Sequence, residues 1–262
     1  MTLILREILL PASCALAIYM LFWFVVSILA GRNDVADVAW GPGFILVGVA
    51  ALLKSDWTPR MLVLLLLVAV WGARLFTHIY LRNRGKGEDP RYKRWREEWG
   101  RWAHLRSLFQ VFALQGALIL VIASPLLIVS AYDAGGFTLL NAIGVAVWLA
   151  GFLFEVVGDL QLARFLRDSA NRGSVMQEGL WHYTRHPNYF GEVTLWWGIF
   201  LVGLSGSPAY LSALISPITI TFLILRVSGI PMLERKREGD PKWESYRRRT
   251  SAFLPLPPRR TP

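Results

Sequence analysis

The sequence predicts an all-α protein that crosses a membrane with about seven helices. Hydrophobic residues make up 54% of the 262 residues, which is more apolar content than one soluble core requires. They fall in blocks that reach or approach the roughly 20 residues a helix needs to cross a bilayer. The predicted spans cover residues 8–30, 38–53, 61–80, 107–131, 139–157, 190–206 and 209–230.

The spans differ in length and composition. In the first, Arg6 is followed by an apolar run that is too long for a signal peptide, so we expect a retained helix. The second and sixth spans are short and rich in Gly. Membrane helices tolerate Gly because neighbouring helices satisfy the freed backbone groups. The remaining spans are longer apolar runs.

Positive charge orients the predicted helices. The net charge is +10, and 22 of the 28 Lys and Arg residues lie in segments 82–106, 164–185 and 235–260. The linkers 131–138 and 205–210 carry none. Because Lys and Arg concentrate on the cytoplasmic side, we expect a cytoplasmic carboxyl terminus and an amino terminus outside. The same bias explains the basic charge without a nucleic-acid partner, for which we find no motif.

Charged side chains at membrane depth are energetically costly and indicate function. Asp34 and Asp37 are three residues apart and share a helical face before an apolar run; a helix cap is the alternative, above all for Asp34. Arg74 and His78 are four residues apart in the third span.

Cys14 is the only cysteine, which excludes an intrachain disulfide and a cysteine metal cluster. We expect no metal site.

The loop after the third span mixes cationic and acidic side chains around two glycines. Glycine lets the backbone approach a ligand closely, and the cations can hold phosphates by charge-assisted hydrogen bonds. A solvated loop that faces anionic lipid is an equal alternative. The polar residues of this loop are Arg82, Asn83, Arg84, Lys86, Glu88, Asp89 and Arg91.

The fifth span carries two carboxylates on one helical face. Glu155 and Asp159 are four residues apart, and Arg164 and Arg167 follow. The carboxylates suit hydroxyls or an amide, whereas the guanidinium fork matches phosphate oxygens. The alternative is a ladder of ion pairs within the helix.

Residues 184–192 read TRHPNYFGE. Pro187 restricts His186 to an extended conformation and suits the first turn of a helix. Asn188 and Glu192 are four residues apart on that helix, so we expect both to point into the bundle.

This stretch, preceded by EGLW and followed by an aromatic apolar helix, resembles the carboxyl-terminal signature of the steroid 5α-reductase family and its sterol-reductase relatives. The resemblance extends to three other segments, GDLQLARFLRD, NRGKGEDPRY and the tail WESYRRRTSAFLPLPP. The chain is most similar to the bacterial branch, for which DVAWG after the first helix is typical.

The resemblance implies a 3-oxo-5α-steroid 4-dehydrogenase-like membrane reductase that uses NADPH. A hydride would reach the β-carbon of an α,β-unsaturated ketone while an acid polarises the carbonyl. In a single membrane domain, 1–262, residues 1–106 would enclose a steroid-like or other lipid enone, and residues 107–262 would bind NADPH on the cytoplasmic side. We expect a monomer surrounded by membrane lipid, in a bacterial inner membrane or an endoplasmic-reticulum-type membrane.

The resemblance implies roles for individual residues of this chain. In mammalian relatives a Glu and a Tyr polarise the carbonyl. Asp37 falls near the Glu position, but Trp71 falls near the Tyr position. Either Asp37 acts with His78 or Tyr80, or the substrate is not a 3-keto steroid. Trp40 and Trp71 are the implied substrate-binding residues. The implied cofactor-binding residues are Arg74, Asn83, Arg84, Lys86, Asp89, Arg91, Tyr92, Glu155, Asp159, Arg164, Arg167, Tyr183, Arg185, His186, Asn188, Tyr189, Glu192 and Arg226.

Two other classes stay open. Isoprenylcysteine carboxyl methyltransferases carry a similar RHP-x-Y-x-G element with a Glu-containing tail and bind S-adenosylmethionine; Glu234 fits that pattern. Asp159 and the arginines after it suit a dinucleotide with several phosphates better. A Rossmann fingerprint is absent, so helix ends and loops would have to hold the dinucleotide. A transporter or lipid-binding protein would also explain buried charge, but not its concentration at cytoplasmic helix ends.

Overall fold

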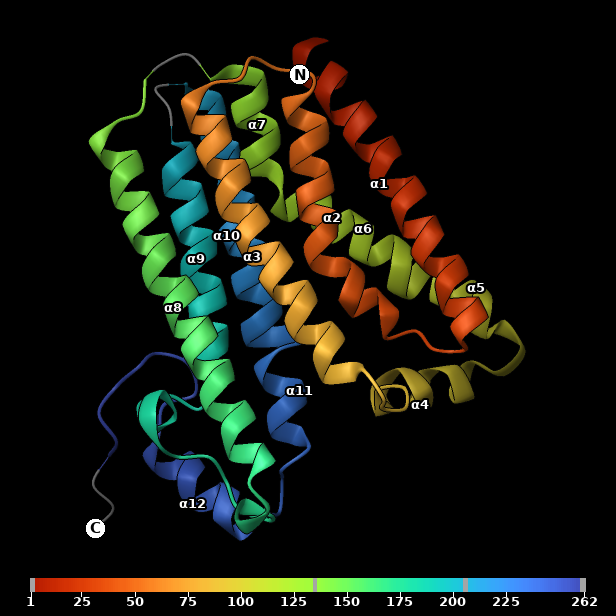
Figure 1. Ribbon diagram of the computed structural model, residues 1–262, viewed down its shortest axis with the longest axis vertical. Helices are drawn as coiled ribbons and strands as arrows, with labels where there is room; N and C mark the ends of the chain where they lie inside the picture. Colours follow the sequence, from red (N-terminus) through yellow and green to blue (C-terminus); the bar gives the residue numbers. More distant parts are fainter. Residues whose placement is uncertain (1–2, 134–135, 205–206, 260–262) are drawn as a thin grey trace. The chain divides into compact units, whose positions relative to one another are not determined.

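A computed structural model describes residues 3–133, 136–204 and 207–259. These residues form α-helices joined by short 3-10 and π-helical turns (Figure 1). Within the described ranges, the only β-type pairing is an isolated bridge between Thr184 and Ser251. The predicted all-α fold is therefore confirmed.

Among the described residues, six stretches are long and apolar enough to cross a membrane: Arg6–Ala30, Val35–Leu52, Pro59–Asn83, Pro90–Ile122, Leu139–Arg167 and Pro208–Arg235. The predicted span 190–206 corresponds to α9 (Pro187–Gly203), a helix of 17 residues that is shorter than these six. The fourth stretch begins well before the predicted residue 107. These helices are compatible with an integral membrane protein, and their orientation stays a prediction.

The chain divides into two compact units. Unit 1 comprises residues 1–138 and 202–216, and unit 2 comprises residues 139–201 and 217–262. The elements of unit 1 are α1 (Leu3–Ala30), α2 (Val35–Leu52), α3 (Pro59–Asn83), α4 (Pro90–Trp99), η1 (Gly100–Trp102), α5 (Ala103–Ser107), η2 (Leu108–Ala113), α6 (Leu114–Ile122), α7 (Ser124–Tyr132) and η5 (Pro208–Leu214).

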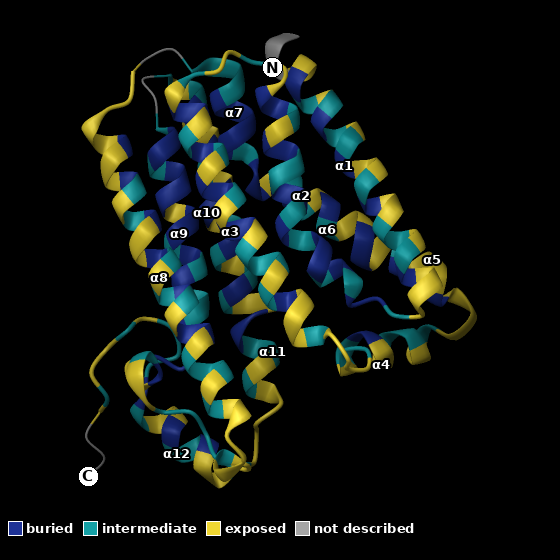
Figure 2. Cartoon of the chain, viewed as in Figure 1, coloured by how far each residue is buried: buried dark blue, intermediate teal, exposed yellow. Residues whose placement is uncertain are grey.

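Helix α2 forms the centre of unit 1. It packs against α1 on one side and α3 on the other (Figure 1), and ten of its 18 residues are buried (Figure 2). The backbones of α2 and α3 approach each other where Gly41 faces Gly72; a Cβ atom at Gly72 would lie 2.7 Å from the Gly41 carbonyl oxygen. The sequence places glycine on both helices because no side chain fits there.

In unit 2, α8 (Leu139–Arg167) and α9 also pack with their backbones close together at glycine residues. A Cβ atom on Gly151 would lie 2.5 Å from the backbone nitrogen of Leu195, and one on Gly198 would lie 2.5 Å from that of Trp148. The other elements of this unit are η3 (Ser169–Asn171), η4 (Gly179–His182), α10 (Ile215–Phe222, of which residues from 217 onward belong here), η6 (Leu223–Val227), α11 (Ile230–Arg235) and α12 (Pro241–Arg249).

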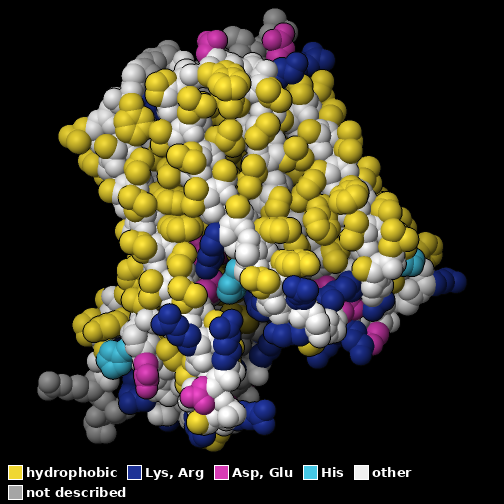
Figure 3. Space-filling view, viewed as in Figure 1, with side chains coloured by type: hydrophobic (Ala, Val, Ile, Leu, Met, Phe, Trp, Pro, Cys, Tyr) yellow, Lys and Arg dark blue, Asp and Glu magenta, His cyan; other side chains and the backbone are white. Residues whose placement is uncertain are grey.

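The outward faces of the long helices are apolar. Leu29 and Ile18 on α1 are 82% and 69% exposed, and hydrophobic side chains cover the visible face of α1 and α3 in Figure 3. Contiguous exposed apolar surface of this extent suits contact with lipid chains. In unit 1, Lys and Arg side chains gather at the end where α3 meets α4 (Figure 3).

The contact between Gly41 and Gly72 can be tested by adding one methyl group. Gly41→Ala places a Cβ atom against the Gly72 carbonyl group, so we expect the free energy of unfolding to fall by about 1–3 kcal/mol, as overpacking does in cores. Thermal unfolding of the detergent-purified protein would measure it. Gly87→Ala is the control, because a Cβ atom there meets nothing within 4 Å. Equal melting temperatures in the two variants would contradict the packing.

Candidate functional site

In unit 1, the predicted acid Asp37 is hydrogen-bonded to a tyrosine. The hydroxyl of Tyr92 donates to Asp37 Oδ1 over 2.6 Å, and Arg91 Nη2 lies 3.4 Å from Asp37 Oδ2. Asp37 belongs to the first turn of α2, and Tyr92 to the first turn of α4. Tyr92 is buried, with 6% of its surface exposed. The structure therefore unites a predicted catalytic residue with two predicted cofactor residues.

Local signals explain why α4 begins where it does. The side chain of Asp89 accepts a hydrogen bond from the Arg91 backbone nitrogen at 2.8 Å, and Pro90 occupies the first turn. Both are strong helix-start signals. They place Arg91 and Tyr92 directly after the cap, where both side chains contact Asp37.

Asp34 connects the start of α2 to this loop. Its carboxylate accepts two hydrogen bonds of 2.6 Å from Arg32 and one of 2.9 Å from the Asp89 backbone nitrogen, but it makes no capping bond to its own helix. Asp34 raises the pKa of the Arg32 guanidinium. The capping role offered as an alternative for Asp34 is thus replaced by a tertiary contact.

A second contact joins the same two segments. The Asn33 backbone nitrogen donates to Glu88 at 2.7 Å, and Glu88 also pairs with Arg96 at 2.8 Å. Much of the charge of this loop is therefore internally balanced. Arg84 and Lys86 remain exposed on the loop, and Asn83 is half-buried.

The other candidates of unit 1 lie in two places. Trp40 and Trp71 both pack edge-on against Phe44, with ring centroids 5.2 Å and 5.4 Å away. Trp71 is fully buried, so this residue belongs to the core of the unit. On α3, Arg74 and His78 are half-buried and Tyr80 is exposed.

In unit 2, the carboxylates of α8 meet the beginning of α9. Glu155 and Asp159 are buried, and Asn188 Nδ2 donates to Asp159 Oδ1 at 3.0 Å. Gly158 allows this approach, since a Cβ atom there would lie 3.1 Å from the Asn188 backbone nitrogen. Glu192 follows one turn later and is half-buried. The structure thus brings a carboxylate of α8 and the amide of Asn188 together.

Cationic groups extend from the same helix. Arg164 and Arg167 lie in the last turn of α8 and are exposed. Among the described residues, neither forms an ion pair. Arg226 is also exposed, on the π-helical turn η6.

Arg185 and His186 converge on one carboxylate. Arg185 Nη2 lies 2.8 Å, and His186 Nε2 3.1 Å, from the same oxygen of Glu234. Both basic residues are buried. Burial lowers the pKa of His186 from its ordinary value, against the opposing effect of Glu234. Tyr189 stacks on the His186 ring at 5.7 Å, whereas Tyr183 is exposed.

The sequence did not identify these contacts of Glu234 with Arg185 and His186, or of Tyr92 with Asp37. Tyr92 carried a signal, because it closes the NRGKGEDPRY motif. Glu234 was noted only for its place in the tail, and its partners lie 48 and 49 residues away. No helical spacing links residues so far apart.

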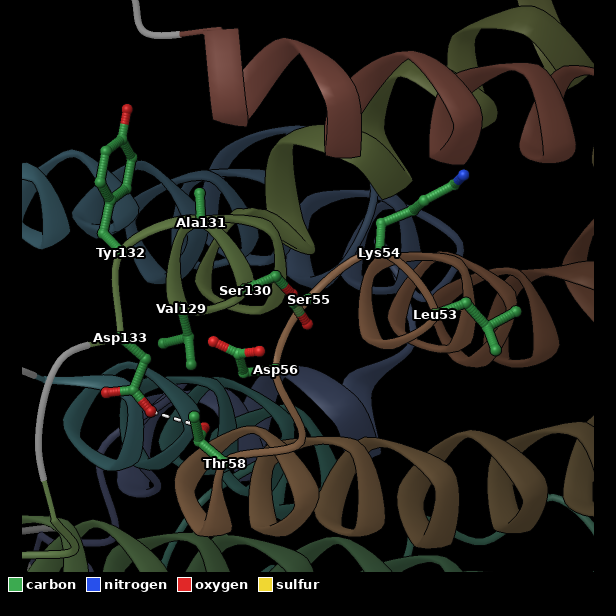
Figure 4. Close-up of a pocket in the computed structure, with 10 residues that line it drawn as sticks. All are labelled: Leu53, Lys54, Ser55, Asp56, Thr58, Val129, Ser130, Ala131, Tyr132 and Asp133. Carbon is green, nitrogen blue, oxygen red and sulfur yellow. Dashed lines mark hydrogen bonds between the residues drawn. The ribbon is translucent and has the colours of Figure 1, made fainter.

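An open cavity of about 600 Å³ lies elsewhere in unit 1, lined by residues of the loop before α3 and of the end of α7 (Figure 4). The predicted catalytic and binding residues do not line it. Its buried carboxylate, Asp133, accepts a hydrogen bond of 2.6 Å from Thr58 and pairs with Arg60. This cavity is therefore separate from the candidate site.

Comparisons with known proteins show the family. A family profile described as "Protein of unknown function (DUF1295)" matches residues 23–250, so the chain belongs to that family, which is related to the steroid 5α-reductase superfamily. An uncharacterized protein of Schizosaccharomyces pombe, C594.04c, is 26% identical over 176 residues, which cover 58% of this chain and 51% of the relative. The chain thus spans about half the length of that relative. No solved structure matches.

We predict that protonation of His186 makes the stability of the folded protein depend on pH. Because its pKa is lower in the folded protein than the ordinary 6.5, the unfolded chain binds more protons as the pH falls through that value, and stability decreases below about pH 6.5. Glu234 and Arg185 are the charged groups that face it. We expect His186→Gln to weaken the acid-side fall in melting temperature. His182→Gln, an exposed histidine nearby, should not. Parallel curves for wild type and His186→Gln would contradict this assignment.

Proposed function

We propose that this chain reduces the C=C bond of an α,β-unsaturated ketone in a steroid-like or other apolar lipid, with NADPH as the cofactor. The observation that carries this proposal is the partly buried hydrogen bond of 2.6 Å between Tyr92 and Asp37. It places a hydroxyl donor beside the predicted acid, in the role for which the sequence offers His78 or Tyr80. Membership of a family related to the steroid 5α-reductases supports the same reaction.

The pair is suited to polarising a carbonyl group. A phenol donates a hydrogen bond and can also release its proton, whereas the indole of Trp71 can only donate. When negative charge develops on a carbonyl oxygen, a positioned donor in a site shielded from water stabilises it strongly. Arg91, 3.4 Å from Asp37, balances the charge of the carboxylate while Tyr92 turns its proton toward the substrate.

The groups of unit 2 fit NADPH, which when bound supplies the hydride. Asp159 and Asn188 form a polar pair that can bind ribose hydroxyls or an amide. Arg164 and Arg167 are exposed cations on the same helix as Asp159, and a guanidinium matches phosphate oxygens in a bidentate manner. The 2′-phosphate that distinguishes NADPH from NADH needs such cations.

Arg185 has a different place in this proposal from the one that the motif implies. Its guanidinium already donates to Glu234 and to backbone carbonyl groups. Arg164 and Arg167 are therefore the phosphate ligands that we assign, and Arg185 is not.

A second candidate, an S-adenosylmethionine-dependent methyltransferase, is favoured by one observation. Glu234 of the tail contacts His186 of the RHP element, and such a carboxylate could face a sulfonium. Arg185 already neutralises that carboxylate, however. The exposed arginines of α8 would also have no role with a ligand that lacks phosphate. We therefore prefer the reductase.

Ligand-dependent thermal stabilisation of the detergent-purified protein distinguishes the two candidates. A ligand at 100 times its Kd stabilises the native state by about 2.7 kcal/mol, so we expect NADPH to raise the melting temperature more than NADH or S-adenosylmethionine does. Arg167→Gln should reduce the advantage of NADPH over NADH, and Arg248→Gln, an exposed arginine on α12, should preserve it. Stabilisation by S-adenosylmethionine alone would replace the reductase with the methyltransferase.

The proton donor is tested by turnover of an enone steroid or enone lipid. Tyr92→Phe and Asp37→Asn should lower kcat by about 10²- to 10⁴-fold, the range for general acid catalysis, while stabilisation by NADPH persists. Tyr132→Phe is the matched control in unit 1. If Tyr80→Phe lost turnover and Tyr92→Phe kept it, the donor would be Tyr80 and the proposed pair would be wrong.

A further inference from the structure

We infer that Arg185 is a positioning residue, which fastens the carboxyl-terminal tail to the start of α9 and thereby orients Asn188. We call Arg185, Glu234, Trp243 and the carbonyl groups of residues 247 and 250 the tail clamp. The part of this inference that concerns cofactor affinity rests on the proposed function. The part that concerns the tail does not.

All three nitrogens of the Arg185 guanidinium contact internal partners. Its Nε and Nη2 lie 2.9 Å and 2.8 Å from Glu234 Oε1, and Nη1 donates to the carbonyl oxygens of Arg247 at 2.9 Å and Thr250 at 2.5 Å. The guanidinium also lies 5.9 Å from the ring centre of Trp243. Only 7% of the residue is exposed. One side chain thus joins α11, α12 and the segment after α12.

Backbone contacts make the same connection along a longer segment. The Arg185 nitrogen donates to the Ser251 carbonyl oxygen at 2.9 Å, and the Leu256 nitrogen donates to that of Tyr183 at 3.0 Å. The hydroxyl of Thr184 donates to the Phe253 carbonyl oxygen at 2.9 Å. The tail therefore runs beside residues 183–185 as a strand-like partner.

The segment held in this way leads directly into the candidate cofactor site. Pro187 begins α9 and fixes its own backbone φ, so few free torsions separate Arg185 from Asn188. Asn188 donates to Asp159. A shift of residues 183–186 would therefore move the amide of Asn188 away from that carboxylate.

The geometry of the clamp requires an arginine. A guanidinium has five N–H donors in a fixed fork, whereas a lysine ammonium is a single point with three donors. Lysine at position 185 could pair with Glu234 but could not also reach both carbonyl groups. Glutamine would leave Glu234 beside His186 without its cationic partner.

The experiment compares Arg185→Gln, Arg185→Lys and the double variant Arg185→Gln/Glu234→Gln with wild type. Hydrogen exchange of residues 250–256 reports the tail without any ligand, and NADPH affinity by equilibrium dialysis reports the site. A hydrogen bond to a charged group contributes enough for about a tenfold change in an equilibrium. For Arg185→Gln we expect the exchange of residues 250–256 to become faster, and the affinity for NADPH to become weaker, each by at least about tenfold. Arg185→Lys should give values between those of Arg185→Gln and wild type. KM for NADPH should rise while kcat at saturating NADPH stays near wild type.

Arg248→Gln is the matched control, because its side chain is exposed on α12. The double variant removes the unpaired carboxylate, so it keeps the test valid if Arg185→Gln fails to fold. Unchanged exchange of residues 250–256 in the folded Arg185 variants would overturn the clamp. Faster exchange with unchanged NADPH affinity would overturn the positioning role. If NADPH does not bind wild type, the proposed function fails, and the exchange measurement alone decides whether Arg185 holds the tail.

Discussion

Charge that is removed from water must be neutralised, and this constraint shapes the polar end of each unit. An isolated ion in a low-dielectric surrounding costs several kcal/mol, which only a close partner of opposite charge and further hydrogen bonds can offset. In unit 1, Asp34 meets this requirement through Arg32 and the Asp89 backbone. In unit 2, Arg185 meets it through Glu234 and two carbonyl groups. The helices supply the apolar framework, and these pairs fix the loops between them.

The sequence was sufficient for the fold class and for the local signal that begins α9. Long apolar blocks predicted the helices because length and hydropathy are local properties. The helix start of α9 was predicted from Pro187, whereas the contact of Asn188 with Asp159, 29 residues away, is seen only in the structure. Helix α9 has 17 residues, which is fewer than the roughly 20 that a helix needs to cross a bilayer. Length alone therefore does not identify it as a span. Two of its glycines, Gly191 and Gly198, are explained by packing against α8, which hydropathy does not measure.

The remaining contacts could not be predicted, because they depend on how segments far apart in the chain pack together in the folded protein. A helix cap was an equal interpretation of Asp34 from the sequence, and only the fold shows that its carboxylate accepts a hydrogen bond from the Asp89 backbone. Trp71 falls near a Tyr position of the resembling family by its spacing from the NRG motif, and only the fold shows that it is fully buried and packs against Phe44. The partner of Asp37 lies 55 residues away, in the next loop. In each case the residue type and its position marked the residue as a candidate, but the sequence did not identify the residue that it contacts.

The contact between Arg185 and the tail also bears on how the protein is made. The carbonyl group of Thr250 that Arg185 needs lies 65 residues later in the chain, so at about 5–20 residues per second it leaves the ribosome roughly 3 to 13 s after Arg185. During that interval α9 can enter the membrane, but residues 183–185 lack the partners that the tail provides. The start of α9 is therefore among the last parts of unit 2 to reach its final structure, and a nascent chain interrupted before the tail would contain inserted helices with an incomplete polar end.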